Sequence, residues 1–314
     1  MKILAKTGTS DLATVYVAES SEGKKLEFVE SIQPPFEMKD KWVSIISTLY
    51  GCPVGCPICD AGRDYCGKVN KKDLLNQIDY LVDSRFENRN VTSKQWKIQF
   101  ARMGDPVLNP DVLDVLRELP SRYNAPGLMP SISTVAPRGC LKFLNELIQI
   151  RDELYSEKFQ MQFSVHTTDF VAREKLVPVK TLSFSEMAVW GEKFYRDGTR
   201  KVTLNFALGT DSVVDAKVLS DYFNPEVFVI KLTPVNPTFS AKENKIKTLF
   251  KDENEVSKLA NQLKLYDFDV IVSVGELEEN AIGSNCGQYV TMLNDEINKS
   301  DEMYTYPLDD DVQK

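Results

Sequence analysis

The chain has 314 residues, a net charge of −8 at pH 7, and a composition that is 42% hydrophobic and 27% charged. These values are typical of a globular protein with one barrel-sized domain or two smaller ones. No run of 18 apolar residues and no secretory signal are present, so we expect a cytoplasmic protein without a membrane span. The acidic balance argues against non-specific binding to polyanions, although a local basic face could still meet RNA.

The pattern of apolar residues predicts an N-terminal hairpin followed by alternating strands and helices. Residues 12–30 alternate polar and apolar side chains around a Ser-Ser-Glu-Gly turn, which predicts a β-hairpin. Leu74, Leu75, Ile78, Leu81 and Val82 share one helical face, and Asn109-Pro110 predicts the start of a helix over 111–119. Strands are predicted at 43–48, 97–101, 129–134, 160–166, 201–207, 227–233 and 269–274.

Strands separated by helices of crossover length favour a parallel sheet with helices outside, either open or closed into a barrel. Functional residues in such sheets gather at the carboxyl ends of the strands. We therefore divide the chain into an N-terminal β-hairpin extension (1–40), an α/β barrel (41–275) and a C-terminal segment (276–314). That last segment contains a helix, a loop with Cys286, and an acidic tail.

Three of the six cysteines, Cys52, Cys56 and Cys59, lie within eight residues directly after the first barrel strand. A [4Fe-4S] cluster is held by cysteine thiolates, one per iron, so three local cysteines leave one iron open for a chelating substrate. A structural zinc site needs four ligands, and Cys66 is the alternative fourth ligand. A C-x3-C-x2-C spacing after a strand is the signature of the radical S-adenosylmethionine (SAM) superfamily.

Further segments between roughly residues 12 and 290 resemble, in order, the RlmN/Cfr-type radical SAM adenosine methylases of ribosomal RNA. The matching motifs are Val29-Glu30-Ser31, Met103-Gly104-Asp105-Pro106, Ile132-Ser133-Thr134, Ser164-Val165-His166, Leu232-Thr233-Pro234-Val235-Asn236-Pro237 and Asn285-Cys286-Gly287-Gln288.

The resemblance implies a partial (β/α)6 radical SAM barrel that holds a [4Fe-4S] cluster on Cys52, Cys56 and Cys59. It implies that Cys286 carries a methyl group and that Glu30 accepts a proton. The SAM contacts that it implies are Gly104, Asp105, Ser133, Ser164, Val165, His166 and Asn236.

The resemblance also implies two uses of SAM. In one, the Cys286 thiolate displaces the methyl group and becomes S-methylcysteine. In the other, reductive cleavage of a second SAM gives a 5′-deoxyadenosyl radical, which takes hydrogen from that methyl group. The resulting carbon radical adds to an sp2 carbon of an RNA base or of a nucleotide-like heterocycle. The expected partners are this substrate and an electron donor such as flavodoxin or ferredoxin, and the expected state is a monomer.

The sequence departs from the family pattern in three places. Asp105 replaces a glutamate, and Ile45 stands where the family has a second cysteine that releases the methyl-linked intermediate. Cys66 or Cys140 could substitute for that cysteine. The chain begins close to the hairpin, so we expect it to lack the family's N-terminal helical domain. A basic group that follows the Asn236 motif could contact RNA phosphates: Lys242, Lys245, Lys247 and Lys251.

Two other functions remain open at this stage. A radical SAM enzyme could abstract hydrogen directly from a small molecule or peptide, with no methyl relay through Cys286. A non-enzymatic interaction module could instead use the same cysteines to bind zinc.

Overall fold

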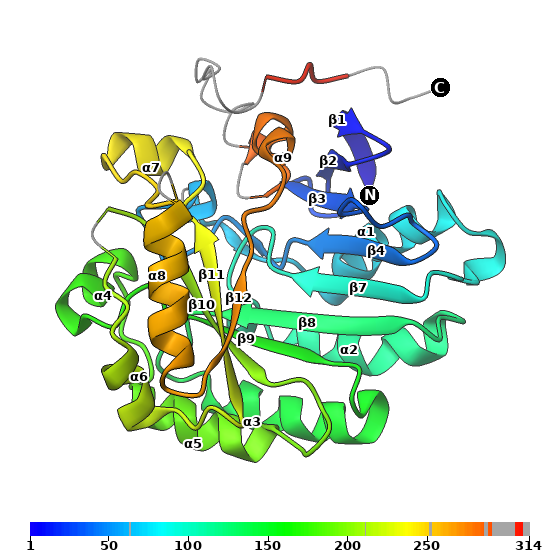
Figure 1. The fold of residues 1–314 in the computed structure, drawn as a ribbon. Helices are drawn as coiled ribbons and strands as arrows, with labels where there is room; N and C mark the ends of the chain where they lie inside the picture. The colour runs from blue at the N-terminus through cyan, green and yellow to red at the C-terminus, as the bar shows by residue number, and fades with distance from the viewer. Residues whose placement is uncertain (63, 211, 251–252, 286–287, 291–304, 310–314) are drawn as a thin grey trace.

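A computed structural model describes residues 1–62, 64–210, 212–250, 253–285, 288–290 and 305–309 of the chain. One ten-stranded sheet runs through it in the order β1-β2-β3-β4-β7-β8-β9-β10-β11-β12 (Figure 1). The end strands of this order are β1 and β12, so the sheet is open. Among the described residues, no helix combines the length and the apolar character needed to cross a bilayer.

Seven strands of this sheet run parallel, and neighbouring strands in the sheet follow one another along the chain apart from short local elements. This arrangement confirms the predicted α/β class with a mostly parallel sheet, and each of the seven predicted strands is present with ends that differ slightly. The strands are β4 (Lys41–Ile46), β7 (Gln95–Phe100), β8 (Leu128–Thr134), β9 (Gln160–Ser164), β10 (Val202–Leu208), β11 (Phe228–Pro234) and β12 (Asp269–Val272).

The N-terminal strands continue this sheet in antiparallel fashion. β2 (Ala13–Glu19) and β3 (Lys25–Ser31) form the predicted hairpin, and β3 pairs with β4. An additional strand that the sequence analysis did not predict, β1 (Lys2–Thr9), pairs with β2 at the edge. Because β3 and β4 share one pleat, side chains of the hairpin face the same two sides of the sheet as those of the parallel strands.

Helices connect the strands, and α1, α2, α3 and α5 run along one side of the sheet in Figure 1. The α-helices are α1 (Lys71–Asp83), α2 (Asp111–Arg122), α3 (Leu141–Ile150), α4 (Phe170–Leu176), α5 (Phe184–Phe194), α6 (Ala216–Tyr222), α7 (Phe239–Glu243), α8 (Glu253–Lys264) and α9 (Leu277–Ile282). Shorter elements are β5 (Leu49–Tyr50), β6 (Gly67–Lys68), the 3-10 helices η1 (Asp60–Gly62), η2 (Glu87–Arg89) and η3 (Pro106–Leu108), and the π-helical turn η4 (Arg151–Tyr155).

The two faces of the sheet differ in polarity. On the helix-covered face, Trp42 stacks on Trp96 with ring centroids 5.3 Å apart, and Trp96 packs edge-on against Tyr123 at the end of α2. The alternate residues of β7, such as Lys97, are polar and only partly buried on the opposite face. We call this opposite side the inner face. The apolar side holds the sheet against the helices, which leaves the inner face available for ligands.

Candidate active site

The loop that carries the three cysteines follows β4 and β5 at the carboxyl end of the first parallel strand. Cys52, Cys56 and Cys59 are half-buried and form no disulfide bond within the described part of the chain. The Cys59 N–H donates to the carbonyl of Cys56 at 3.1 Å, which closes a turn ahead of η1. Among the described residues, no three His, Cys, Asp or Glu side chains are arranged to hold a metal ion, so the three thiols share this loop without converging.

The surroundings of these thiols nevertheless suit a thiolate-bound cluster. Cys52 and Cys56 pack against a small apolar cluster that contains Val54, Val135 and Val177. Burial raises the pKa of both thiols, that of Cys56 to about 12. Backbone N–H groups of residues 54, 105 and 55 point to the Cys52 sulfur and oppose this rise in pKa. A buried thiol does not ionise readily by itself, whereas a bound metal and nearby N–H donors stabilise its thiolate form.

The base of the cysteine loop is closed by Asn109, the residue that follows η3. Its Nδ2 donates to the carbonyl of Thr48 at 2.8 Å and to that of Val69 at 2.7 Å, one on each side of the loop. Its Oδ1 accepts from the N–H of Asp111 at 3.1 Å, at the start of α2. Asn109 therefore joins the two ends of the cysteine loop to the next strand–helix unit.

The Gly104 motif after β7 packs directly on the start of the cysteine loop. The carbonyl of Met103 accepts from the N–H groups of Thr48 and Leu49 at 2.8 and 3.0 Å. Gly104 has φ +91°, and a Cβ at this position would lie 2.4 Å from the side chain of Leu49. The close approach and the positive φ both require glycine here.

Asp105, a predicted SAM contact, is engaged by the chain itself. Its carboxylate accepts from Thr134 Oγ1 at 2.9 Å, from the N–H of Val135 at 2.8 Å and from the N–H of Val107 at 3.2 Å. Burial raises the pKa of Asp105 to about 6, while these hydrogen bonds oppose the rise. The carboxylate thus ties the loop after β7 to the loop after β8, next to Ser133 on the inner face.

The Ser164-Val165-His166 motif lies at the end of β9. The N–H groups of Val165 and His166 donate to the carbonyl of Asn205 at 2.9 and 3.1 Å, and His166 Nδ1 accepts from the N–H of Ala207 at 3.3 Å. Burial, with a smaller effect of Arg173, lowers the pKa of His166 to about 4. At neutral pH the ring is therefore uncharged, and its acceptor at Nδ1 assigns the proton to Nε2.

Arg173, at the first turns of α4, brings a buried cation to the cysteine loop. It donates to the carbonyl of Val135 at 3.3 Å and to Thr181 Oγ1. Burial raises the pKa of Cys56, and the positive charge of Arg173 partly opposes that rise. Burial also lowers the pKa of Arg173 itself to about 10. The positive charge of Arg173 favours the anionic form of Cys56.

The segment after β11 covers the other side of the cysteine loop. Asp60 accepts from the N–H of Ser240 at 2.9 Å, and Thr238 Oγ1 donates to the carbonyl of Ile58 at 3.0 Å. Asn236, a predicted SAM contact, lies two residues before Thr238 and is partly buried. Since β4 and β11 are separated by four strands, these contacts require the sheet to curve around its inner face.

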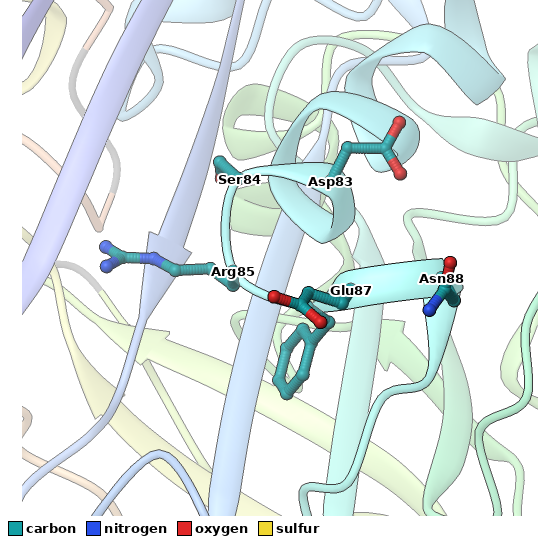
Figure 2. A pocket seen from close by; sticks show the side chains of 6 residues that line it. Asp83, Ser84, Arg85, Glu87 and Asn88 are labelled. Carbon is teal, nitrogen blue, oxygen red and sulfur yellow. The ribbon is translucent and has the colours of Figure 1, made fainter.

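Glu30, the predicted proton acceptor, lies on the helix-covered face of β3. Its carboxylate accepts from Arg85 Nη2 and from the hydroxyl of Tyr16, both at 2.7 Å. Figure 2 shows Arg85 at a hollow of about 480 Å3 beyond α1, with its guanidinium directed away from the other labelled residues. None of the predicted site residues, Glu30 included, lines this hollow.

Glu27, which the sequence analysis missed, faces the inner side of the same strand and is fully buried. Its Oε1 lies 2.8 Å from Arg102 Nη2, and its Oε2 accepts from the N–H groups of Tyr289 and Val290 at 2.7 and 3.2 Å. Arg102 donates to the carbonyls of Gly283 and Ser284, both at 2.8 Å. Cys286 lies outside the described residues, but this ion pair holds the backbone on both sides of it.

A hollow of about 320 Å3 separates the cysteine loop from this C-terminal segment. Its lining includes Gly51, Met103, Gln288 and the exposed Cys66. Cys140 is instead buried at the start of α3. Of the two predicted substitutes for the missing cysteine, Cys66 alone lines the hollow next to the Cys286 segment.

The sequence is similar to several curated proteins of one kind. It is 26% identical over 274 residues to the "Probable dual-specificity RNA methyltransferase RlmN" of Chlorobium phaeobacteroides, covering 83% of this chain and 70% of that protein. Its identity to the protein of the same description from Thermotoga neapolitana is 27% over 247 residues, or 76% and 66% of the two chains. No family model matches the chain. The chain is thus similar in sequence to proteins that are named RlmN-type RNA methyltransferases.

Two solved structures resemble the fold of this chain. A radical SAM methyltransferase from Sphaerobacter thermophilus aligns with a TM-score of 0.69 at 18% identity, covering 92% of this chain and 81% of that one. A spore photoproduct lyase complexed with a dinucleoside spore photoproduct aligns with a TM-score of 0.50 at 14% identity, covering 74% and 76%.

Removing the Asn109 amide should loosen the cysteine loop. Asn109→Ala leaves the carbonyls of Thr48 and Val69 without their donor, at a cost of about 1–3 kcal/mol per buried group. We expect a lower urea midpoint and a lower iron content after anaerobic reconstitution. The control is Asn124→Ala at an exposed amide pair, which should change stability by less than about 0.5 kcal/mol. Equal midpoints and iron contents for the two variants would contradict this role.

Breaking the Glu27–Arg102 pair should destabilise the C-terminal segment. Arg102→Met leaves a buried carboxylate unpaired and should lower the free energy of unfolding by about 3–5 kcal/mol. The Glu27→Gln/Arg102→Met double variant should lose less, because no buried charge remains. Arg117→Met, at an exposed pair with Glu146, is the matched control and should cost about 1 kcal/mol or less. Urea unfolding measures all three; a loss for Arg102→Met no larger than the control's would refute the assignment.

Proposed function

We propose that this chain is a radical SAM methylase in which Cys286 carries a methyl group to an sp2 carbon of an RNA base or nucleotide-like heterocycle. The observation that carries the proposal is the position of the cysteine loop. It lies at the carboxyl end of β4, between the Gly104 loop and α7, in a chain related to the RlmN/Cfr-type proteins.

Cys52, Cys56 and Cys59 are the proposed ligands of a [4Fe-4S] cluster. When bound, such a cluster supplies the electron that cleaves SAM to a 5′-deoxyadenosyl radical. Val54, Val135 and Val177 exclude water from two of these sulfurs. Arg173 offsets the negative charge that three thiolates bring to a buried site.

SAM is proposed to bind between the loops that follow β7, β8, β9 and β11. Gly104 allows close approach to the backbone, while Ser133, Ser164, Val165, His166 and Asn236 offer side chains or backbone from the neighbouring loops. Because Asp105 already accepts three hydrogen bonds from the chain, we assign its contact with the SAM amino group to the backbone of its loop. The carboxylate then acts by shaping that loop.

Cys286 is the proposed methyl carrier. Its thiolate displaces the methyl group from the sulfonium of SAM, which leaves S-adenosylhomocysteine and S-methylcysteine. The Glu27–Arg102 pair positions the segment on both sides of it. We place Cys66, across the hollow that Gln288 lines, as the thiol that takes the role of the cysteine absent at Ile45. On this proposal Glu27 holds the segment of the methyl carrier, whereas Glu30 faces the helices.

The relatives are named RNA methyltransferases, which supports RNA or a nucleotide as the substrate class. The loop after β11 supplies Lys242, Lys245 and Lys247 for phosphate contacts, while Lys251 lies outside the described residues. We also propose that an electron donor such as flavodoxin or ferredoxin serves as a partner and that the protein is a monomer.

A second candidate function keeps the cluster and omits the methyl relay, so that hydrogen is abstracted directly from a small molecule or peptide. It is favoured by Ile45, which pairs with Val29 on the inner face of β4 and places a methyl-bearing side chain where the family has a thiol.

The methyl carrier can be tested by intact-mass analysis. Protein incubated with SAM should gain one methyl group, and tandem spectra should place it on Cys286; Cys286→Ala should gain none, whereas Cys140→Ala should behave as the wild type. An unmodified wild-type protein with a full complement of iron would exclude the methyl relay.

The two candidate functions differ in the fate of deuterium. With methyl-deuterated SAM, the methyl relay predicts deuterium in 5′-deoxyadenosine in the wild type and none in Cys286→Ala. Direct abstraction from substrate predicts unlabelled 5′-deoxyadenosine in both proteins, and that outcome would select the second candidate.

A further inference from the structure

The inner face of the sheet is lined with polar side chains. In β7 and β9 every second residue is polar and partly exposed to this side, while the intervening apolar residues are buried against the helices. The contacts between the cysteine loop and α7 show that the sheet curves around this face. The polar members are Gln95, Gln99, Ser131, Gln160, Gln162, Ser164, Thr203 and Asn205. This alternation is typical of a solvated interior rather than a packed core.

Three lysines project from this same face. Val43 of β4 pairs with Lys97 of β7, so Lys41, two residues before Val43, lies on the same side of the pleat. Lys231 of β11 pairs with Asn205 of β10, and β10 is the third strand after β7 in the sheet. Lys97 and Lys231 are both partly exposed, yet protein surrounds them on most sides. Partial exposure together with enclosure by protein on most sides is expected of side chains inside a curved sheet that water can enter.

These cations repel one another and lack acidic partners. Burial, with Lys231, Lys41 and Arg200, lowers the pKa of Lys97 to about 7, and burial with Lys41 lowers the pKa of Lys231. No ion pair to Lys41, Lys97, Lys231 or Arg200 is formed within the described part of the chain. Enclosed charges normally have a partner, because an unpaired one destabilises the fold.

Two observations point to a ligand. Asn205, beside Lys231, is only 8% exposed, and its Oδ1 has no hydrogen-bond partner among the described residues. A cavity of about 470 Å3 opens at the amino ends of the strands, and Met129 in its wall is the register partner of Lys97. Its other charged or polar lining residues are Lys94, Gln95, Glu157, Lys158, Thr199 and Arg200, so that Lys97, Lys231 and Asn205 lie outside its wall. Lys94 is paired with Asp40 at 2.7 Å, whereas the charge of Arg200 acts on Lys97.

We propose that the inner face binds the phosphomonoester of a small, nucleotide-sized substrate through Lys97, Lys231 and Arg200, with Asn205 hydrogen-bonding the substrate. The inference rests on the proposed function, since it names the substrate class of that enzyme. It places the phosphate toward the amino ends of the strands, while the cysteine loop lies at their carboxyl ends. A phosphomonoester carries about −1.5 to −2 charge at neutral pH, which matches several converging cations better than the single charge of an RNA phosphodiester. The interior of a curved sheet also accommodates one terminal phosphate group more readily than the backbone of a polymer.

Binding can be measured by calorimetry on the anaerobically reconstituted full chain, with 5′-AMP, adenosine and inorganic phosphate as probes. We expect 5′-AMP to bind more tightly than adenosine and phosphate to compete with it. Lys97→Met and Lys231→Met should each weaken 5′-AMP binding by about 10- to 100-fold, because each removes a hydrogen bond to a charged group. Lys72→Met, at an exposed lysine of α1, should leave binding unchanged.

Thermal melting separates this role from a structural one. Since Lys97→Met removes repulsion, its melting temperature without ligand should equal or exceed that of the wild type, and phosphate should no longer raise it. Equal binding of 5′-AMP and adenosine, or unchanged 5′-AMP binding by both lysine variants, would overturn the proposal. Full competition by a single-stranded RNA without a terminal phosphate would also overturn it, in favour of a polymer contact. Methylation of Cys286, read by mass in the same samples, reports on the proposed function separately.

Discussion

The buried ion pair between Glu27 and Arg102 joins three parts of the chain that are distant in sequence. Glu27 belongs to the N-terminal hairpin and Arg102 to the loop after β7. Arg102 binds the backbone of residues 283 and 284, and Glu27 that of residues 289 and 290. Neither side chain is accessible to water, so the charges are stable only while all these partners are in place. The position of the described C-terminal residues 283–285 and 288–290 relative to the cysteine loop therefore depends on this pair.

The N-terminal hairpin contributes to the candidate site as well as to the sheet. A hairpin added to the edge of a parallel sheet could simply cover that edge. Here β3 continues the pleat of β4, so that Glu27 points to the inner face while Glu30, three residues later, points to the helices and pairs with Arg85. The same strand thus stabilises the outer packing with one carboxylate and positions the site with another.

The division between an apolar and a polar face explains how one sheet serves both stability and chemistry. Trp42, Trp96 and their neighbours hold the helices, whereas the inner face retains lysines and amides that contribute little to packing. The loops at the carboxyl ends are tied to each other by Asn109, Asp105 and Asp60. The proposed cluster and SAM sites therefore lie at one end of a polar interior, in which the inner lysines are the main charged groups.

The parallel strands and the cysteine loop could be predicted from the sequence, because both depend on local patterns of residues. Apolar periodicity located the seven parallel strands, and spacing alone identified Cys52, Cys56 and Cys59 as one loop. The resemblance led to Glu30 alone and Glu27 was missed, since only the pairing of this strand with β4 shows that Glu27 faces inward. Arg102, Asn109 and the lysine group were missed because the residues that each of them meets or faces are distant in sequence.

The central claim, that the cysteine loop holds a cluster with an open iron, is tested most directly by electron paramagnetic resonance of the reduced, reconstituted full chain. The account predicts a signal of a reduced [4Fe-4S] cluster that changes when SAM is added and is absent in Cys56→Ala. A protein that binds zinc instead of iron, or a cluster signal that SAM leaves unchanged, would contradict it.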